Sequence, residues 1–457
     1  MHARLNDITP TSEKPYNGDL LGRDKSGEVL EQMVSAFSDG CVIALHGKWG
    51  SGKTTFINMW SEYMRNQKYT VLNYNAWEAD YIPDPVIGLI AEFKKATDPK
   101  GKKTVEKMTK AAAKISFAMI PEIISQIAKY YTGVDFEKIV KEGSKESMKI
   151  LNQCIKNYEK QQKSIEDFKG ALIEYIASQQ SDKPVIYIID ELDRCNPTYA
   201  VKTLERIKHL FCVPNIIFVL SIDREQLCNS VRGYYGSDLI DGDDYLRRFI
   251  DIQYDLPLGN LDNLIKSVLQ RFGYTKEMLK IKNSEYTIED FAKFISLLYQ
   301  IRRLSIRQME KWLLYTRLVV KRTSNYTIAP TTILFMIFIR MFDTALYVRY
   351  KLGDIDDQSI MDYFVEHFSE ALFDTGGYHA YYTYDAIAQF MRMRYSHNDV
   401  AFAERILDEK GVFHLKLNNI INEDWLRGAF QTAKTLPKLL DIIHIIEITD
   451  SLHINDN

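Results

Sequence analysis

The sequence predicts an α/β fold with a parallel sheet, a helical insertion in the sheet-forming part, and a helical C-terminal region. Up to about residue 257, apolar runs that end in glycine or acidic residues alternate with stretches of helical periodicity. This alternation is typical of parallel strands joined by right-handed crossover helices. From residue 261 to the end the β signals fade and helical periodicity remains. The chain is therefore predicted to pass from an α/β part into a helical part.

Four segments have the composition of strands. Residues 41–47 (CVIALHG) predict a short buried strand that ends in glycine. A second strand is expected within residues 69–77, before a turn-rich segment. Residues 183–190 (KPVIYIID) and 215–223 (NIIFVLSID) are nearly continuous apolar runs. Such runs indicate parallel strands that are buried on both faces.

Helices are predicted between these strands. Residues 28–37 (EVLEQMVSAF) have an amphipathic pattern, which favours a helix before the first strand. Asn196 followed by Pro197 is typical of a helix N-cap and first helical position. A helix is therefore expected to begin just after the third strand.

The interval from about residue 92 to 180 is helical in pattern and rich in lysine, which predicts a helical insertion. Its most apolar stretch, residues 115–128, contains Pro121 and Glu122. That stretch is shorter than the roughly 20 apolar residues that span a bilayer as a helix. Membrane association is therefore not expected.

Composition and charge exclude several classes of protein. The 457 residues are enough for two or three domains, and 46 % hydrophobic with 26 % charged residues is ordinary for a folded protein. The formal charge of -3 shows no overall basic excess, so a nucleic-acid surface would have to be local. The five cysteines lack the close pairs of zinc or redox sites, and the first residues lack an apolar signal segment. A cytoplasmic location is expected.

The loop after the first strand carries the pattern G-x-x-x-x-G-K-[ST] as residues 47–54, GKWGSGKT. Its glycines let backbone N–H groups turn inward around phosphates, Lys53 neutralises phosphate charge, and the Thr54 hydroxyl can bind Mg²⁺. The strand before and the helix after are the context that this motif requires. The sequence thus predicts a P-loop nucleotide site for ATP and Mg²⁺. The loop residues assigned to it are Gly47, Trp49, Gly50, Ser51, Gly52, Lys53, Thr54 and Thr55.

A second acidic motif ends the third strand. Asp190 is placed to hold the magnesium shell, and Glu191 to orient or deprotonate an attacking water. Asp193 is an alternative base. Asp193 and Arg194 could instead form an ion pair that closes the end of the strand.

Further candidates lie after the fourth strand. Ser221 could present its hydroxyl to the γ-phosphate or to water, or could merely cap the strand. Arg247 and Arg248 are candidates for an arginine finger, alongside the alternative of a solvated helix face. Arg307, in the helical part, is a candidate reporter of phosphate state to a lid.

Two local patterns bear on nucleic acid. Residues 302–322 hold seven basic residues against Glu310 alone, and Arg303, Arg307 and Lys311 are expected on one helical face. The stripe could bind phosphates, although a solvated face is the favoured interpretation. Residues 376–396 are rich in tyrosine, which favours a core or an oligomer interface over base stacking.

Five segments together resemble the KAP family of P-loop NTPases. They are HGKWGSGKTTFI at 46–57, NYNAWEAD at 73–80, IDELDRCNPTYAVKTLERIKHLF at 189–211, FVLSIDREQL at 218–227 and DYLRRFIDIQYDLP at 244–257. The resemblance covers about the first 315 residues discontinuously. The tryptophan of the P-loop, NAWE and DELDRC are its most specific parts.

The resemblance implies an ATPase of the additional-strand class, related to AAA-like and STAND-like switches. It gives Lys53, Thr54, Asp190 and Glu191 the phosphate, magnesium and base roles. It also implies that Glu78 lies near the site, and that the segment DLLGR, ending at Arg23, approaches the nucleotide base. Many members carry transmembrane helices between the two nucleotide motifs, where this chain has its charged insertion. Some bacterial members are connected with exclusion of phage.

The predicted domains are a tail at 1–17, a P-loop NTPase domain at 18–257, a helical lid at 258–322 and a helical C-terminal domain at 323–457. We expect the ATPase component of a regulatory or anti-phage system, forming a homo-oligomer and acting with a separate effector or regulatory protein. The alternatives are a nucleotide-dependent scaffold or membrane-associated binding protein with little turnover, and a P-loop kinase.

Overall fold

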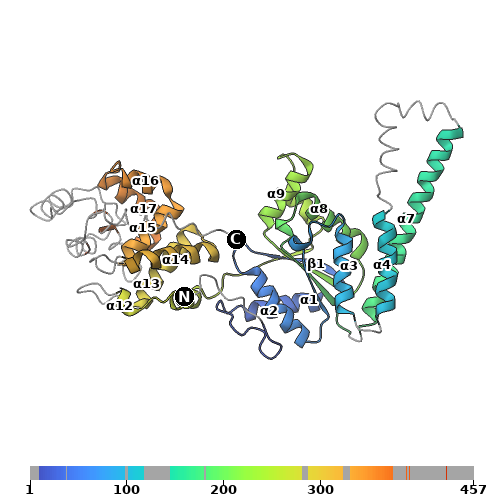
Figure 1. The fold of residues 1–457 in the computed structure, drawn as a ribbon, viewed down its shortest axis with the longest axis horizontal. Coiled ribbons are helices and arrows are strands. Elements are labelled where there is room, and N and C mark those ends of the chain that lie inside the picture. The colour runs from blue at the N-terminus through green and yellow to red at the C-terminus, as the bar shows by residue number, and fades with distance from the viewer. Residues whose placement is uncertain are drawn as a thin grey trace, which may run out of the picture. The chain divides into compact units, whose positions relative to one another are not determined.

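The computed structural model describes residues 10–37, 39–97, 101–117, 145–179, 182–279, 287–322 and 330–373, with a few isolated helical positions beyond. The chain divides into two compact units, one from Asp7 to Pro257 and the other from Leu258 onward. Figure 1 shows the elements of both units, which are described separately below.

The first unit is built on a five-stranded parallel sheet with the strand order β2-β3-β4-β1-β5. β4 therefore lies between β1, which leads into the P-loop, and β3, which leads into the acidic motif. The parallel sheet expected from the sequence is confirmed. The strands are β1 Cys41–His46, β2 Val71–Asn75, β3 Val185–Asp190, β4 Ile216–Ile222 and β5 Ile252–Asp255.

Alternation along the strands sends side chains to two separate cores. On β3, Ile186 and Ile188 belong to the core beneath α1 and α2, whereas Tyr187 and Ile189 belong to the core on the opposite face. All six residues of β3 and all seven of β4 are buried, as expected for central parallel strands. Figure 1 shows α1 and α2 on one side of the sheet and α3 and α8 on the other.

The helices of this unit begin where their caps allow. Asn196 accepts a hydrogen bond from the Thr198 amide at 3.0 Å, and Pro197 takes the first turn, as predicted. Asp84 caps α3 in the same way through the Val86 amide, also at 3.0 Å. These helices are α1 Asp24–Ala36, α2 Lys53–Asn66, α3 Pro85–Ala96, α8 Pro197–Arg206, α9 Arg224–Tyr235 and α10 Gly242–Arg247, with 3-10 turns η1 Trp77–Ala79 and η2 Leu192–Arg194 and a π-helical turn η3 Ile207–Phe211.

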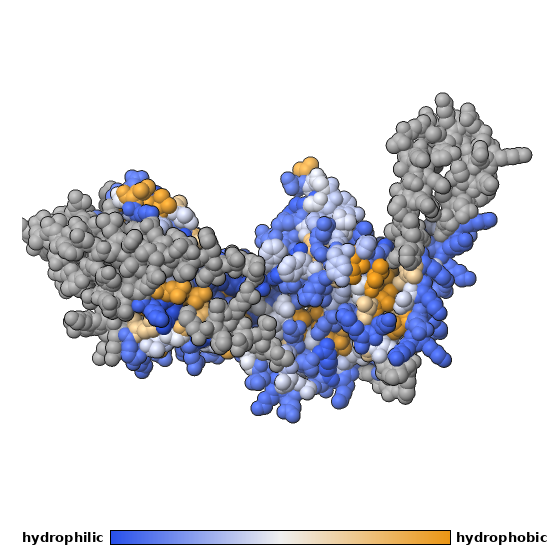
Figure 2. All heavy atoms as spheres, viewed as in Figure 1, coloured by the Kyte–Doolittle hydropathy of each residue, from blue (hydrophilic) through white to orange (hydrophobic). Residues whose placement is uncertain are grey.

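The insertion consists of helices in its described parts, as the sequence predicts. α4 (Lys102–Phe117) packs along α7 (Lys145–Ala177), and Phe168 and Tyr175 of α7 join the core over the sheet. Figure 1 shows these two helices beside α3, and Figure 2 shows an apolar surface over α3 and α4. Most of the apolar stretch 115–128 lies outside the described residues.

The described secondary structure of the second unit is entirely helical, which confirms the predicted helical C-terminal part. α15 is the apolar centre of this unit, because every residue from Pro330 to Ile339 is buried. The helices are α11 Leu261–Arg271, α12 Lys276–Leu279, α13 Ile288–Arg302, α14 Ile306–Arg322, α15 Pro330–Phe342, α16 Thr344–Lys351 and α17 Asp357–Phe373.

One expectation for this unit is wrong. Arg303 was expected to share a helical face with Arg307 and Lys311, but it lies between α13 and α14 with a left-handed φ of 47°. The two helices break there, so the predicted basic stripe loses its first member. The tyrosine-rich stretch 376–396 lies almost wholly outside the described residues.

Within the part of the chain that the structure describes, no single helix is long and apolar enough to span a membrane. α15 and α16 meet the length and composition requirement only as a pair, and that pair is bent by 117°.

Candidate functional site

The P-loop owes its shape to glycines that adopt left-handed backbone conformations. Gly50 and Gly52 have φ of 74° and 82°, which side-chain-bearing residues rarely adopt. At Gly47 the constraint is space, because an added Cβ would lie 2.8 Å from Ser51 Oγ. α2 starts directly after Gly52. The positive end of a helix and the amides of the loop therefore meet at one place, as phosphate binding requires.

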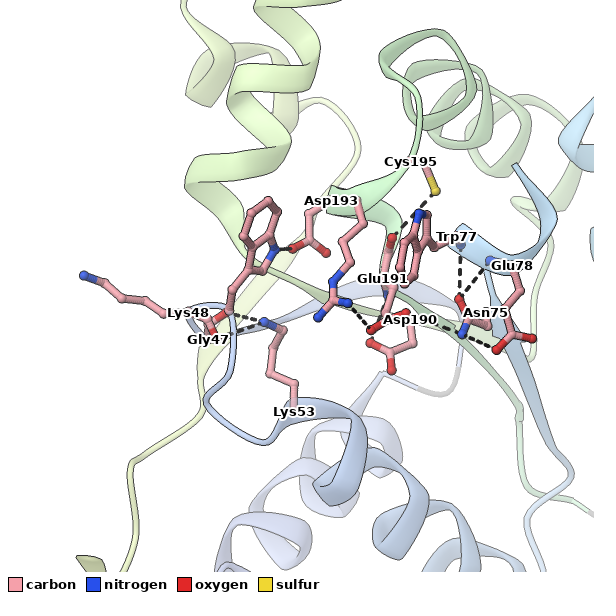
Figure 3. A network of polar contacts seen from close by, with 12 residues as sticks. Gly47, Lys48, Lys53, Asn75, Trp77, Glu78, Asp190, Glu191, Asp193 and Cys195 are labelled. Carbon is pink, nitrogen blue, oxygen red and sulfur yellow. Dashed lines mark hydrogen bonds and ion pairs between the residues drawn. The ribbon is translucent and has the colours of Figure 1, made fainter. Parts of the chain in front are cut away.

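Lys53 lies within this loop and is mostly buried. Its ammonium donates hydrogen bonds to the carbonyl oxygens of Gly47 and, at 3.3 Å, Lys48 (Figure 3). Burial lowers the pKa of Lys53, and the nearby carboxylates of Asp193, Asp223 and Asp190 oppose that shift. The loop thus holds a buried cation among acidic residues, ready to exchange carbonyl partners for phosphate oxygens.

Trp49 is tied to two acidic residues. Its indole Nε1 donates to Asp193, and its backbone amide donates to Asp223 at 3.0 Å. Both carboxylates are buried, whereas the Trp49 side chain is 44 % exposed. The tip of the P-loop is therefore fixed to the segments that follow β3 and β4. Neither contact was foreseen, since no spacing rule links position 49 to positions 193 and 223.

The strand register places the predicted acidic residues at one edge of the sheet. Asp190 at the end of β3 pairs with Asn75 on β2 and with Ser221 on β4. Asp190 Oδ1 accepts a hydrogen bond from the Glu191 amide at 2.9 Å. Figure 3 shows Lys53, Asp190 and Glu191 at this edge. Residues from three strands and the P-loop therefore face the same region.

Glu191 has an unusual conformation and several partners. Its φ is 59°, which is uncommon for a residue with a side chain and turns the chain sharply after β3. One carboxylate oxygen lies 3.1 Å from the Arg194 guanidinium, and the other lies 3.5 Å from Asn75 Nδ2. Burial raises the pKa of Glu191, and Arg194 opposes the shift. The candidate base is thus aimed at the site and held by two side chains.

The alternative ion pair between Asp193 and Arg194 is wrong. Arg194 pairs with Glu191, and Asp193 turns to the Trp49 indole. Burial raises the pKa of Asp193, while the bond from Trp49 and the charge of Lys53 oppose that shift. In a 3-10 turn, residues three positions apart lie on the same side. Arg194 therefore lies beside Glu191, whereas Asp193, two positions after Glu191, points in another direction.

Ser221 and the two threonines differ in their surroundings. Ser221 is fully buried at the end of β4, and its Oγ finds no hydrogen-bond partner among the described residues. A buried hydroxyl without a partner is costly, so this oxygen is suited to a ligand or water. Thr54 and Thr55 are exposed at the start of α2, where a bound group can reach them.

The residues present fit ATP and Mg²⁺. Gly50 and Gly52 shape the cradle, Lys53 faces it, and the unpartnered Ser221 hydroxyl marks a polar position beside it. Magnesium would be held by Asp190 and Thr54 together with phosphate oxygens. The described residues contain no group of three or more His, Cys, Asp or Glu side chains that could hold a metal by themselves. Such a site suits a cation that arrives with a phosphate.

Arg23 supports the P-loop from outside. Its guanidinium donates to the Ser51 carbonyl oxygen at 2.9 Å, and its side chain is buried. Its backbone amide bonds the Asp19 carboxylate. Arg23 therefore contacts the P-loop itself, and the approach of its segment to a nucleotide base stays a prediction.

The arginine candidates of the later segments are placed differently. Arg247 ends α10 and Arg248 follows it, both exposed, and Arg248 lies 3.4 Å from Asp244. Arg307 is exposed on α14 of the second unit. Burial raises the pKa of Glu310, and the charges of Arg271 and Arg307 oppose that shift. Roles for Arg247, Arg248 and Arg307 at a bound nucleotide stay predictions.

Asn75 was missed by sequence reasoning. Its Nδ2 donates to Glu78 Oε1 at 2.9 Å and faces Glu191, while its Oδ1 accepts from the Trp77 and Glu78 amides at 3.1 and 3.3 Å. The NAWE segment contained the signal, since an asparagine after a strand commonly forms such a turn. Glu78 does lie near the site, joined to it through Asn75.

Comparisons with known proteins agree with this geometry. The model of the KAP family P-loop domain matches residues 23–326. The "Phage T7 exclusion protein" of Escherichia coli (strain K12) is 21 % identical over 284 residues, which cover 58 % of this chain. The match spans about a third of that relative's length, 36 %.

Two solved structures are similar at low scores. They are the ORC2 protein of Aeropyrum pernix (13 % identity, TM-score 0.33, covering 94 % of this chain and 86 % of that one) and AMPPCP-bound DnaA from Aquifex aeolicus (11 %, 0.26, 94 % and 93 %). Structural similarities this low support no conclusion about the function of this chain. The family match covers well over half of the chain and coincides with the P-loop and the acidic motif, so the chain belongs to the KAP family of P-loop proteins.

Proposed function

We propose that this protein is a Mg²⁺-dependent, ATP-hydrolysing switch that serves as the ATPase component of a cytoplasmic anti-phage or regulatory system. One observation carries the hydrolytic part. Asp190 ends β3 at the sheet edge that the P-loop occupies, and Glu191 follows it with a left-handed backbone and a carboxylate that contacts Asn75 and Arg194. A second carboxylate beside the magnesium ligand is what separates hydrolysing sites from simple phosphate cradles.

The roles of the side chains follow from their positions. Lys53 leaves its two carbonyl partners and neutralises the β- and γ-phosphates. Asp190 and the exposed Thr54 hydroxyl would hold Mg²⁺, which would supply positive charge to offset the charge that develops on the phosphate. Ser221 offers its unpartnered hydroxyl to the γ-phosphate or to the attacking water.

Glu191 accepts the proton of the attacking water. The water oxygen bonds to the γ-phosphorus as the bond to the bridging oxygen breaks, which yields ADP and inorganic phosphate. A glutamine at position 191 keeps the shape of the side chain and cannot accept this proton. Turnover is then expected to fall while nucleotide binding persists.

The test is phosphate release from ATP by the wild-type protein, Lys53→Ala and Glu191→Gln. Lys163→Ala and Glu166→Gln, exposed on α7, are matched controls. We expect both site variants to lose turnover and both controls to keep it. Only Lys53→Ala should also lose ATP binding, measured by isothermal titration calorimetry. A rate that survives Glu191→Gln would refute the hydrolytic mechanism. ATP binding without any turnover in the wild-type protein would favour the scaffold alternative.

The anti-phage part rests on the family and on the E. coli relative, whose printed name is an exclusion protein. Because the match covers about a third of that relative, we propose that a separate effector or regulatory protein supplies the remaining chemistry. The test is the plating efficiency of phage T7 and other phages on cells that express this chain with its adjacent genes. Plating should fall with the wild-type chain and recover with Glu191→Gln.

We further propose a homo-oligomer in which the exposed Arg247 and Arg248 approach the nucleotide of a neighbouring copy. Mixing Lys53→Ala protein with an Arg247→Ala/Arg248→Ala double variant tests this. Recovered turnover in the mixture would indicate a finger from another subunit. No recovery, with each variant correctly folded, would argue against it.

A further inference from the structure

Arg194 lies beside the candidate base in the DELDRC segment, although neither the phosphate, the magnesium nor the base role was assigned to it. Its guanidinium is 3.1 Å from Glu191 Oε1 and stacks over the Trp77 ring, with 5.3 Å to the ring centroid. The side chains of Arg194 and Glu191 are only 22 % and 14 % exposed, so solvent screens their interaction weakly. This is not an ordinary surface pair.

Both carboxylate oxygens of Glu191 have a partner in this arrangement. Arg194 takes one oxygen, and Asn75 Nδ2 faces the other at 3.5 Å. A general base must present a free lone pair to the water that it deprotonates. Each oxygen keeps a further lone pair, but the ion pair fixes the orientation of the carboxylate and offsets its charge, so release of Arg194 would let Glu191 turn toward the attacking water.

The position of Arg194 also brings it close to the phosphate cradle. Burial lowers the pKa of Lys53, the carboxylates of the three nearby aspartates oppose that shift, and the charge of Arg194 adds to it more weakly. One guanidinium thus acts on the candidate base and on the phosphate-binding lysine. The two cations repel each other, the acidic side chains beside them offset part of that repulsion, and a polyphosphate would offset more of it.

A terminal phosphate is a better partner for Arg194 than Glu191. A phosphate offers three oxygens and more negative charge than a carboxylate, and guanidinium groups bind it in a bidentate manner. The site therefore contains a cation, Arg194, that is paired with a carboxylate. ATP would bring a stronger anionic partner for it.

We propose that Arg194 exchanges partners when ATP binds, leaving Glu191 for the γ-phosphate, and so serves as a phosphate-binding catalytic residue that frees the base. The inference rests on the proposed ATPase function and deepens it. The Trp77 ring contacts the guanidinium in the resting position, and Asn75 remains to orient the released carboxylate. No covalent bond is broken in this step; only the ion pair with Glu191 and the contact with the Trp77 ring are lost. ADP lacks the γ-phosphate and leaves the pair intact.

The first test compares the affinities of a non-hydrolysable ATP analogue and of ADP, so hydrolysis plays no part in the readout. Arg194→Ala should weaken analogue binding about 10- to 100-fold, the range for a lost hydrogen bond between charged groups, and change ADP binding little. Arg194→Lys should restore part of the difference. Arg65→Ala is the matched control, because Arg65 forms an ion pair of the same spacing with Glu62 on α2.

A double-mutant cycle then separates contact from mere structural support. Glu191→Gln removes the competing carboxylate, so it should tighten analogue binding several-fold in the wild-type background. In the Arg194→Ala background the same substitution should have no such effect. Equal tightening in both backgrounds, or an unchanged preference for the analogue over ADP in Arg194→Ala, would overturn the exchange.

Tryptophan fluorescence gives an independent readout. The analogue should change the emission of the wild-type protein as the guanidinium leaves the Trp77 ring, and ADP should change it less. The change should be absent in Trp77→Phe and in Arg194→Ala. If the wild-type protein and Glu191→Gln bind neither nucleotide, the proposed ATPase function itself fails. If both nucleotides bind and turnover depends on Glu191, a negative result concerns Arg194 alone.

Discussion

The P-loop after β1 and the acidic segment after β3 face the same region but are built differently. The P-loop depends on backbone shape, with Gly50 and Gly52 in left-handed conformations and Lys53 bonded to carbonyl oxygens. The segment after β3 depends on side-chain contacts, since Glu191 is held by Arg194 from the same segment and by Asn75 from β2. The first region is specified by consecutive residues, and the second by packing between strands.

Because the two regions are built differently, we expect their variants to change different quantities, which binding and kinetic measurements can separate. The P-loop contacts phosphates in the ground state, so its variants should chiefly change affinity. In the segment after β3, Glu191 acts on the attacking water, so Glu191 variants should chiefly change turnover, whereas Arg194 is the residue of this segment that should change affinity.

The largest effect is expected at Glu191. Glu191→Gln should lower kcat by about 10²- to 10⁴-fold, the usual contribution of a general base, while ATP binding persists. Steady-state phosphate release and equilibrium binding measure the two quantities separately. A fall in affinity with an unchanged kcat would reverse the assignment of the two regions.

A smaller effect, on affinity, is expected at Gly52. An alanine there must adopt a φ of 82°, which costs about 1 to 3 kcal/mol in the binding conformation. Gly52→Ala should therefore weaken ATP binding by about 10-fold or more with a lesser effect on kcat. Gly170→Ala on α7 is the control, because nothing lies within 4 Å of its added Cβ. Calorimetric titration of both variants would decide, and equal affinities would contradict the prediction.

The Asn75 side chain has two functions that substitutions can separate: its Oδ1 caps a turn, and its Nδ2 faces Glu78 and Glu191. Asn75→Asp keeps the oxygen that accepts from the Trp77 and Glu78 amides but replaces the amide that faces Glu78 and Glu191 with a carboxylate. Turnover should fall about tenfold through charge repulsion, with Tm nearly unchanged. Asn75→Ala should lower both, because the turn loses about 1 kcal/mol of capping. A Tm loss as large in Asn75→Asp as in Asn75→Ala would contradict this separation.

The smallest effect concerns a thiol at the opposite end of β1. Burial and the charge of Asp251 raise the pKa of Cys41 to about 11, whereas Cys212 is exposed. Iodoacetamide at pH 8 should therefore label Cys212 much faster than Cys41, since the thiolate is the reactive form. Raising the pH to 9 should increase Cys41 labelling about tenfold, because the thiolate fraction below the pKa rises tenfold per unit. Peptide mass spectrometry would follow each residue, and a pH-independent Cys41 rate would contradict the prediction.

Sequence patterns were most informative where chemistry is local. The P-loop, the buried strands β3 and β4, and the cap formed by Asn196 each follow from neighbouring residues, and the structure has them where they were predicted. The short strand β5 was not singled out, because it is half-exposed and lacks a continuous apolar run.

Long-range pairings were not predictable in the same way. The bonds from Trp49 to Asp193 and Asp223 join residues more than a hundred positions apart, and only the strand order brings them together. The pairing of Arg194 with Glu191 is local, at three positions, but it depends on a 3-10 turn and a left-handed residue, which composition does not reveal. The break at Arg303 has the same origin, since an arginine with positive φ has no sequence signal.

The position of β4 between β1 and β3 sets a length scale for the site. Neighbouring strands lie about 4.8 Å apart, so two spacings separate the strand that leads to Lys53 from the strand that ends in Asp190, roughly 10 Å. That width leaves room for a phosphate with its lysine on one side and its hydrated cation on the other. Ser221, at the end of the intervening strand, marks the midpoint of this gap. β4 thus sets the distance between the P-loop and the acidic residues, and this distance is suited to a phosphate group.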